Sequence, residues 1–238
     1  MNRMFVNYAH RGASEYCPEN TLLSFYTGVY MGANGIETDV QLTKDGIPVL
    51  FHDDTLARMM GQEGSVGDYT YEELRQFPMK KNGLTDYIIT LEQFLSCFRK
   101  MDLTFAIELK GAGTEEKTAA LIRKFGVEEK CVVTSFQFPY LEKMHAVMPE
   151  ARLGYLAEKE GVTPELLEKM VTMGFYEICP HAQDVTAESV ALWHGMGLGV
   201  RAWGVANEEL MKQLVDRGVD GMTVNFPDKL TAYLSRDL

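Results

Sequence analysis

Short apolar runs alternate along the chain with segments in which hydrophobic residues recur every three or four positions. The short runs are typical of buried strands, and the periodic segments are typical of helices that pack one face against a sheet. Nine runs qualify as strands: 5–9, 36–41, 49–52, 105–109, 132–136, 152–156, 177–180, 200–203 and 221–224. Their alternation with helical segments predicts parallel β/α units.

Helix starts are marked by side chains that can satisfy the free N–H groups of a first turn. Thr70 with Glu73 and Thr90 with Gln93 have the spacing of capping boxes. Pro18 is predicted to open the first helix, because proline suits the first helical position.

The second and third runs need a different connection, because only a short Asp45-Gly46 turn separates them. No crossover helix fits there, so the pair is predicted to be an antiparallel hairpin that brings His52 beside Asp39. Eight parallel strands remain. The predicted fold is α/β, a single (β/α)8 TIM barrel with a β-hairpin after strand 2 and a small insertion before helix 2.

The insertion is predicted at residues 54–84, a segment that fits neither a strand nor a barrel helix well and contains four glycines. We expect it near the rim of an active site. A length of 238 residues is within the range of one barrel, so residues 1–238 are predicted to form a single domain.

The composition of the chain limits the classes of molecule that it is expected to bind. A formal net charge of −11 disfavours nucleic acid and anionic membranes, so a small anionic substrate would need a local cation. No apolar stretch approaches the roughly 20 residues that cross a bilayer, which predicts no stable membrane anchor. The four cysteines are widely spaced and are predicted to be reduced thiols in a cytoplasmic protein. A homo-oligomer is compatible with the sequence.

Three carboxylates are predicted to meet at the mouth of the barrel. Glu37 and Asp39 lie two apart on one strand and therefore share a face, and Glu108 ends the neighbouring strand. Oxygen ligands suit one divalent cation, Mg²⁺ or Ca²⁺ with Mn²⁺ as a further option. The alternative is a buried ion pair of Glu37 or Glu108 with Arg11 or Lys110, which needs no metal.

Two histidines follow strands beside these acids. His10 and His52 can exchange protons near neutral pH, as cleavage of a phosphodiester requires. His145 and His194 are expected to be packing residues on helices, and His181 is left open.

The ordered motifs resemble those of the glycerophosphodiester phosphodiesterases over nearly the whole chain. The matching segments are His10-Arg11-Gly12, Pro18-Glu19-Asn20-Thr21, Ile36-Glu37-Thr38-Asp39-Val40, His52-Asp53, Glu108-Leu109-Lys110, Ser135-Phe136, Trp203-Gly204-Val205, Gly218-Val219-Asp220-Gly221 and Phe226-Pro227-Asp228. The resemblance implies metal-assisted hydrolysis of glycerophosphodiesters, such as glycerophosphocholine, to sn-glycerol 3-phosphate and an alcohol.

The same resemblance implies roles for individual residues. His10 and His52 match the acid/base pair, Arg11 and Lys110 the cations that contact phosphate, and the three carboxylates the metal ligands. Phe136 and Trp203 match aromatic residues that wall the substrate pocket. Asp53 is either an orienting partner of its neighbouring histidine or a cap for its own backbone, and Glu19 and Asn20 are either partners of site residues or the opening turn of a helix.

Two departures from the family pattern stand out. Gly204 and Ala206 replace the usual Thr and Asn after Trp203, and Asn225 replaces a common Asp. Neither is expected to touch the proposed metal or histidine set. The rival functions are a lysophospholipase D-type lipid phosphodiesterase, which exposed Met59 and Met60 at the rim would favour, and a non-catalytic phosphodiester-binding barrel.

Overall fold

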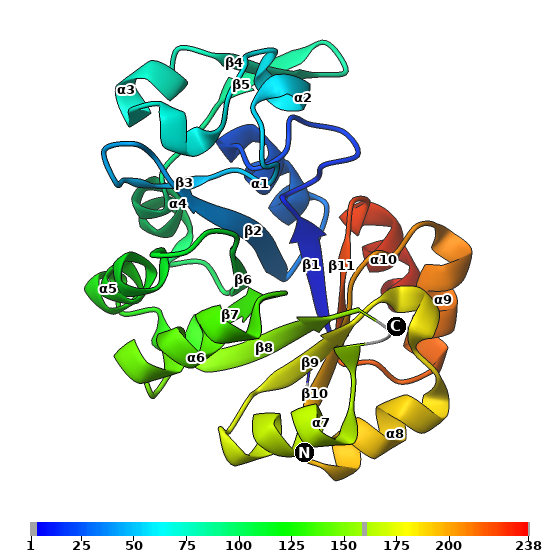
Figure 1. Cartoon of the computed structure of the whole chain (residues 1–238). Coiled ribbons are helices and arrows are strands. Elements are labelled where there is room, and N and C mark those ends of the chain that lie inside the picture. Colours follow the sequence, from blue (N-terminus) through cyan, green and yellow to red (C-terminus); the bar gives the residue numbers. More distant parts are fainter. Residues whose placement is uncertain (1–3, 159–160, 238) are drawn as a thin grey trace.

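The computed structural model describes residues 4–158 and 161–237, and its strands form a closed parallel barrel (Figure 1). Around the barrel these strands are β1 (Val6–His10), β2 (Gly35–Leu42), β6 (Thr104–Leu109), β7 (Cys131–Ser135), β8 (Arg152–Ala157), β9 (Glu177–Pro180), β10 (Gly199–Ala202) and β11 (Gly221–Val224). Since β1 pairs with both β2 and β11, the sheet closes on itself. The prediction of a TIM barrel is confirmed.

Helices pack around the outside of the barrel (Figure 1). They are α1 (Leu22–Tyr30), α4 (Leu91–Phe98), α5 (Glu115–Phe125), α6 (Phe138–Val147), α7 (Pro164–Thr172), α8 (Ala187–Gly195), α9 (Glu208–Asp216) and α10 (Pro227–Leu234). Short 3₁₀ turns occur at Glu128–Lys130, Ala182–Asp184 and Ser235–Asp237. In α4 the buried residues recur every three or four positions, and the predicted capping box of Thr90 with Gln93 is present.

The first helix begins later than predicted. It starts at Leu22, because the hydroxyl of Thr21 accepts a hydrogen bond from the backbone N–H of Ser24 and so caps it. Pro18 therefore lies in the loop between β1 and α1. This loop also carries Glu19, which matters for the site described below.

The predicted hairpin is present, with β3 (Pro48–Leu50) antiparallel to β2. Its register pairs Val40 with Leu50, so the loop is centred on Asp45. The backbone N–H of Phe51 donates to the carbonyl of Asp39 at 3.0 Å. His52 thus lies one residue beyond the position opposite Asp39, just past the end of the strand.

The segment between β3 and α4 contains α2 (Ala57–Met60), the 3₁₀ turn Val66–Asp68, α3 (Tyr71–Leu74), β4 (Pro78–Lys81) and β5 (Leu84–Tyr87). We call residues 54–87 the insertion. It reaches beyond residue 84 because β4 and β5 pair as an antiparallel hairpin. Asn82 and Gly83 form the turn with φ of 51° and 78°, the left-handed geometry that an Asn-Gly pair favours in two-residue hairpins.

A second hydrophobic core fixes the insertion to the barrel. It consists of Val49, Phe51, Leu56, Met60, Val66, Leu74, Met79 and Ile88, whereas the main core joins the barrel to its helices. Val49 lies in the hairpin strand β3 and Phe51 directly follows it, so the insertion packs directly on the hairpin that leads to His52.

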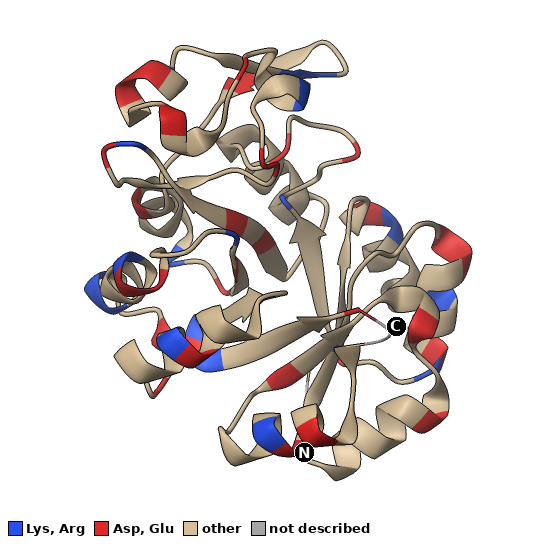
Figure 2. Ribbon diagram, viewed as in Figure 1, with Lys and Arg blue, Asp and Glu red and all other residues tan. Residues whose placement is uncertain are grey.

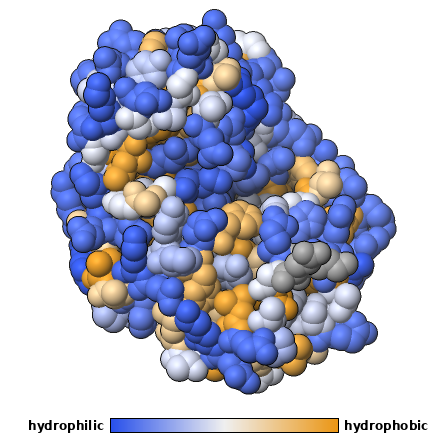
Figure 3. All heavy atoms as spheres, in the orientation of Figure 1, coloured by the Kyte–Doolittle hydropathy of each residue, from blue (hydrophilic) through white to orange (hydrophobic). Residues whose placement is uncertain are grey.

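Most charged residues lie outside the barrel strands. Figure 2 shows most Lys, Arg, Asp and Glu on helices and loops, with acidic bands on β2 among the exceptions. The face in Figure 3 is mostly hydrophilic, with smaller hydrophobic patches near its centre. Within the described ranges, no helix is both long and apolar enough to span a membrane. All four cysteines lie in these ranges as free thiols.

Candidate active site

The predicted site residues gather at the carboxyl end of the barrel strands. Parallel pairing places His10 beside Glu37 and Asp39 beside Glu108. Most of them open on a cavity of about 310 Å³, whose lining does not include Asp39 or Lys110. Its lining includes His10, Arg11, Glu37, His52, Glu108, Phe136, Leu156, Glu158, Arg201, Trp203, Gly204 and Thr223. One cavity thus unites both histidines with acids, cations and aromatic rings.

Glu37, Asp39 and Glu108 form a buried carboxylate cluster, with one oxygen of each within 4.8 Å of the others. Burial and the charge of Asp39 raise the pKa of Glu37 well above its usual value and that of Glu108 to about 7. For Asp39 burial acts in the same direction, but Arg11, His52, Lys110 and the hydrogen bond from Asn20 together outweigh it and lower the pKa. The cluster is therefore electrostatically costly without a further positive charge.

The two predicted cations lie against this cluster. Lys110 Nζ is 3.2 Å from Glu108 Oε1, and Arg11 Nε is 3.3 Å from Asp39 Oδ2. The ion-pair alternative is thus partly realised, since two cations face three carboxylates. Glu37 instead accepts the backbone N–H of Arg11 at 3.1 Å.

One oxygen of the cluster has no protein partner. Asn20 Nδ2 donates to Asp39 Oδ2 at 2.9 Å, and Asn20 Oδ1 in turn accepts from the hydroxyl of Thr38 at 2.7 Å. Asp39 Oδ1 is buried, and no described residue gives it a hydrogen bond. A buried carboxylate oxygen without a partner is unusual and fits a site that binds a cation.

His10 lies against Asn225, which corrects the expectation that this departure stays away from the histidines. Asn225 Oδ1 is 2.6 Å from His10 Nδ1 and also accepts from Ser14 Oγ at 2.9 Å. The cause is the closure of the barrel, because β1 pairs with β11 in a register that aligns Ala9 with Val224. Burial first and Arg11 second lower the pKa of His10 to about 4, so it is neutral at pH 7.

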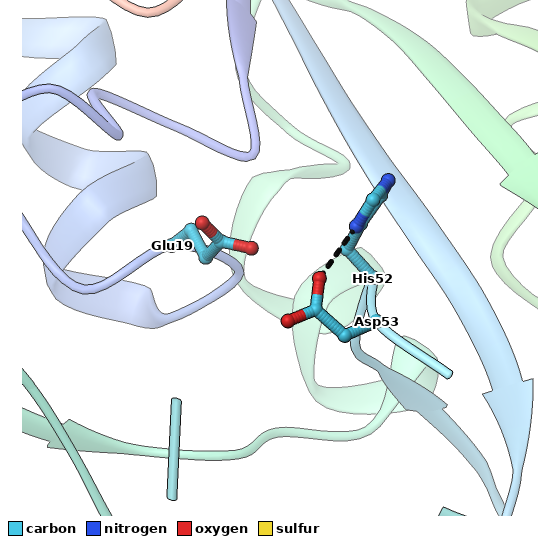
Figure 4. Close-up of side chains that lie close together, drawn as sticks. All are labelled: Glu19, His52 and Asp53. Atoms are coloured by element: carbon cyan, nitrogen blue, oxygen red, sulfur yellow. Dashed lines mark hydrogen bonds and ion pairs between the residues drawn. The ribbon is translucent and has the colours of Figure 1, made fainter. Parts of the chain in front are cut away.

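His52 is oriented by the next residue in the chain. Its Nδ1 lies 2.8 Å from Asp53 Oδ1, as Figure 4 shows. Arg58 and the contact with His52 lower the pKa of Asp53 to about 2, although partial burial opposes this. Of the two roles considered for Asp53, the structure shows the contact with the imidazole. Glu19 likewise contacts a site residue, because it accepts from Arg11 NH1 at 3.0 Å.

Aromatic side chains wall the other side of the cavity. The rings of Phe136 and Trp203 meet edge to face with centroids 4.9 Å apart, and His181 packs on Trp203 at 4.7 Å. Gly204 has φ of 71°, and a Cβ there would lie 2.7 Å from the His181 ring. Gly204, one of the departures from the family pattern, therefore makes room for the His181 ring against Trp203. The sequence did not single out Arg201, on the floor of the cavity, or the lining residues Thr134, Leu156, Glu158 and Thr223.

The other predicted histidines lie apart from the cavity. His145 is on α6 and His194 on α8, where His194 Nε2 is 2.8 Å from Asp220 Oδ2. Met60 is buried and Met59 is partly buried in the second core. These two methionines therefore give no support to a lipid-binding rim.

Comparison with known proteins identifies the family. The model of the glycerophosphoryl diester phosphodiesterase family matches residues 10–229. The chain belongs to this family. A glycerophosphodiester phosphodiesterase of Bacillus altitudinis is 34% identical over 234 residues, which cover 93% of this chain and 95% of the relative. The predictions of the family and of a phosphodiesterase are confirmed.

Two further proteins extend the comparison. A glycerophosphodiester phosphodiesterase of Caldanaerobacter subterraneus is 33% identical over 233 residues, with 93% of this chain and 94% of the relative covered. A phosphodiesterase of Oleispira antarctica, solved in complex with the product sn-glycerol-3-phosphate, is 26% identical with a TM-score of 0.85. That similarity covers 97% of both chains. The relatives thus match the whole barrel rather than one motif.

Proposed function

We propose that the chain hydrolyses glycerophosphodiesters to sn-glycerol 3-phosphate and an alcohol. The observation that carries this proposal is a cavity lined by two imidazoles, Arg11, Glu37 and Glu108, with Asp39 and Lys110 paired directly to its lining residues. The family match and the relative with sn-glycerol-3-phosphate bound support the same substrate class. On this proposal residues 1–238 act as one functional domain.

Glu37, Asp39 and Glu108 would hold one divalent cation, for which Mg²⁺ and Ca²⁺ are the first choices and Mn²⁺ the next. The fit rests on the unpartnered Oδ1 of Asp39 and on the surplus of carboxylates over nearby cations. When bound, the ion supplies positive charge beside the phosphoryl oxygens. Lys110 and Arg11 would add to this charge and contact the phosphate directly.

His10 and His52 are proposed as the acid/base pair. One imidazole accepts the proton of the neighbouring glycerol hydroxyl as its oxygen attacks phosphorus, and the other donates a proton to the leaving alcohol. The resulting cyclic phosphate is opened by water when the two histidines exchange roles. Asn225 and Asp53 each contact an Nδ1, which leaves Nε2 of each ring for the reaction.

The aromatic pair Phe136 and Trp203 is proposed to wall the pocket beside the glycerol or the leaving group. Trp203 Nε1 is a buried donor that no described residue satisfies, so a substrate oxygen is a suitable partner. Cytoplasmic location and subunit assembly stay predictions from the sequence.

The test is release of sn-glycerol 3-phosphate by the purified chain. After treatment with a chelator, the chain is given Mg²⁺, Ca²⁺ or Mn²⁺ with glycerophosphocholine, glycerophosphoethanolamine or glycerophosphoglycerol. Cation-dependent release is expected. No release in any combination would favour the non-catalytic binding barrel, and faster release of choline from lysophosphatidylcholine would favour the lysophospholipase D-type function.

A further inference from the structure

A second group of acidic and imidazole side chains lies beside the proposed centre. Glu19, His52 and Asp53 bring one possible ligand atom each within 4.8 Å of the others (Figure 4). A guanidinium group already supplies the positive charge here. Arg58 contacts Glu19 at 2.6 and 2.9 Å and Asp53 at 2.6 and 2.8 Å. The group is therefore a network around an arginine rather than a second metal site.

We propose that Arg58 is a positioning residue, which holds His52 and Arg11 in their working places by binding Asp53 and Glu19 at the same time. The inference rests on the proposed function and adds a role for the insertion, because Arg58 lies on α2. No residue of the barrel strands makes this connection in the described part of the chain.

Asp53 and Glu19, the two carboxylates that Arg58 binds, each contact a different site residue. Asp53 Oδ1 contacts His52 Nδ1 at 2.8 Å, so the direction of the imidazole depends on where Asp53 is held. Glu19 Oε1 accepts from Arg11 NH1 at 3.0 Å, and Arg11 Nε reaches Asp39 at 3.3 Å. Arg58 thus connects the histidine after the hairpin to the arginine after β1.

The geometry requires a guanidinium group. Arg58 uses Nε and both terminal nitrogens to bind two carboxylates, each through two hydrogen bonds. An ammonium group has three donors around one atom and cannot reproduce this planar arrangement. Lysine at this position would therefore keep the positive charge but could not bind Asp53 and Glu19 in the same way at the same time.

The insertion is anchored well enough to serve as a support. Met60, two residues after Arg58, is buried in the second core, and the residue before α2, Leu56, is buried there too. The β4–β5 turn also binds the loop between β1 and α1, where Asn82 Nδ2 donates to the carbonyls of Glu15 and Tyr16 at 3.2 and 3.1 Å. The loop that carries Arg11 is therefore held from two directions.

Loss of Arg58 leaves two neighbouring carboxylates without their shared cation. Glu19, with 9% of its side chain exposed, and Asp53, with 20%, would then repel each other. We expect Asp53 to turn from His52 toward solvent and Glu19 to compete with Asp39 for Arg11. Turnover should suffer more than substrate binding, because the cavity keeps its lining.

The experiment compares Arg58→Gln and Arg58→Lys with Arg75→Gln. Arg75 is a matched control in the same insertion: its side chain is 55% exposed against 50% for Arg58, and it pairs with Glu72 on α3 alone. The measurements are kcat and KM for glycerophosphocholine with the best cation, the melting temperature, and nitrogen NMR of the imidazoles. A His52→Asn variant assigns the His52 signals.

We expect Arg58→Gln to lower kcat about 10- to 100-fold with little change in KM, since loss of an outer partner of a site has effects of this size. Arg58→Lys should lie between this variant and the wild type, and Arg75→Gln should match the wild type. In the wild type, NMR should show His52 with its proton on Nδ1, and Arg58→Gln should show a mixture of tautomers.

Two results overturn the inference: kcat of Arg58→Gln within about twofold of Arg75→Gln, or an unchanged His52 tautomer in Arg58→Gln. If Arg58→Gln does not fold, Arg58→Lys decides by the same two criteria. A wild type that releases no sn-glycerol 3-phosphate refutes the proposed function instead, and the NMR comparison then judges the role of Arg58 by itself.

Discussion

Two groups of buried charges lie in the same barrel, and they are built in opposite ways. At the mouth, Glu37, Asp39 and Glu108 outnumber their cations and leave one carboxylate oxygen without a protein partner. On the floor of the cavity, Arg201 pairs with Glu177 at 2.7 Å in a complete set of contacts. We call these the mouth cluster and the floor pair.

Within the floor pair, the guanidinium group of Arg201 has further partners inside the barrel. Arg201 NH1 donates to the hydroxyl of Thr223 at 2.8 Å, NH2 lies 3.2 Å from Cys179 Sγ, and the guanidinium stacks over Tyr8 at 5.0 Å. All three guanidinium nitrogens of Arg201 thus have partners inside the barrel, so this pair has no need of a ligand. A buried pair of this kind costs stability when one member is lost.

The mouth cluster lacks such closure, and this difference separates a binding site from a structural ion pair. Both groups are buried, and both contain acids on barrel strands, so burial by itself does not identify function. The decisive property is the balance of charge and of hydrogen-bond partners. Four substitutions or conditions test this comparison.

The largest expected effect separates turnover from stability at the mouth. His10→Ala or His52→Ala should lower kcat about 10²- to 10⁴-fold, the usual contribution of a general acid or base. The free energy of unfolding should change by about 1 kcal/mol or less, because the side chains of His10 and His52 are 29% and 30% exposed. His194→Ala, on α8, is the control for activity. Near-normal turnover in either variant refutes the role proposed for that histidine.

The floor pair should respond in the reverse way. Arg201→Met should lower the free energy of unfolding by about 3–5 kcal/mol, because Glu177 is left as a buried charge without its partner. The measurement is urea denaturation of the metal-free chain. The double variant Glu177→Leu with Arg201→Met should regain much of the loss. If Arg201→Met were as stable as the wild type, the distinction between floor and mouth would fail.

Glu37→Gln tests the cation directly. Divalent cation affinity, measured by calorimetry, should fall by more than about 100-fold, above the range for loss of an outer partner of a metal site. The metal-free variant should be at least as stable as the wild type, because one of three mutually repelling carboxylates is gone. Glu72→Gln on α3 is the control. Unchanged affinity removes Glu37 from the proposed ligand set.

The smallest effect is a pH dependence of the metal-free chain. Folding raises the pKa of Glu108 to about 7, so the unfolded chain ionises more readily, and stability should fall as pH rises from about 4.3 through 7. Urea midpoints at pH 5 and pH 8 measure this fall, which added cation or Glu108→Gln should reduce. A urea midpoint that rises over this pH range, with cation absent, contradicts the excess of negative charge inferred for the mouth cluster.

Some features of the site were predictable because they depend on local pattern. Glu37 and Asp39 share a face since side chains alternate along a strand, and the short turn required a hairpin. The Asn82-Gly83 turn was equally local, yet the strand-like pattern around it is too weak and exposed to be recognised. The sequence predicted only that His52 returns beside Asp39, and the exact register depends on the loop centre, which the structure places at Asp45.

Contacts that depend on closure of the barrel or on packing of the insertion could not be predicted from the sequence. Asn225 touches His10 because the last barrel strand returns beside the first, 215 positions earlier in the chain. Arg58 reaches Glu19 across 39 positions because the second core fixes the insertion over the first loop. Neither pairing leaves a periodic signal, since it depends on how whole elements pack.

The sequence by itself determined the alternation of strands and helices, the hairpin, and which acids, histidines and cations follow strand ends. It did so because hydrophobic periodicity and turn chemistry act over a few residues. Only the tertiary structure decided which oxygen of Asp39 stays free, which partner orients each histidine, and that Arg58 connects Asp53 beside His52 with Glu19 beside Arg11. Those outcomes depend on distances between elements, which barrel closure and the packing of the insertion set together.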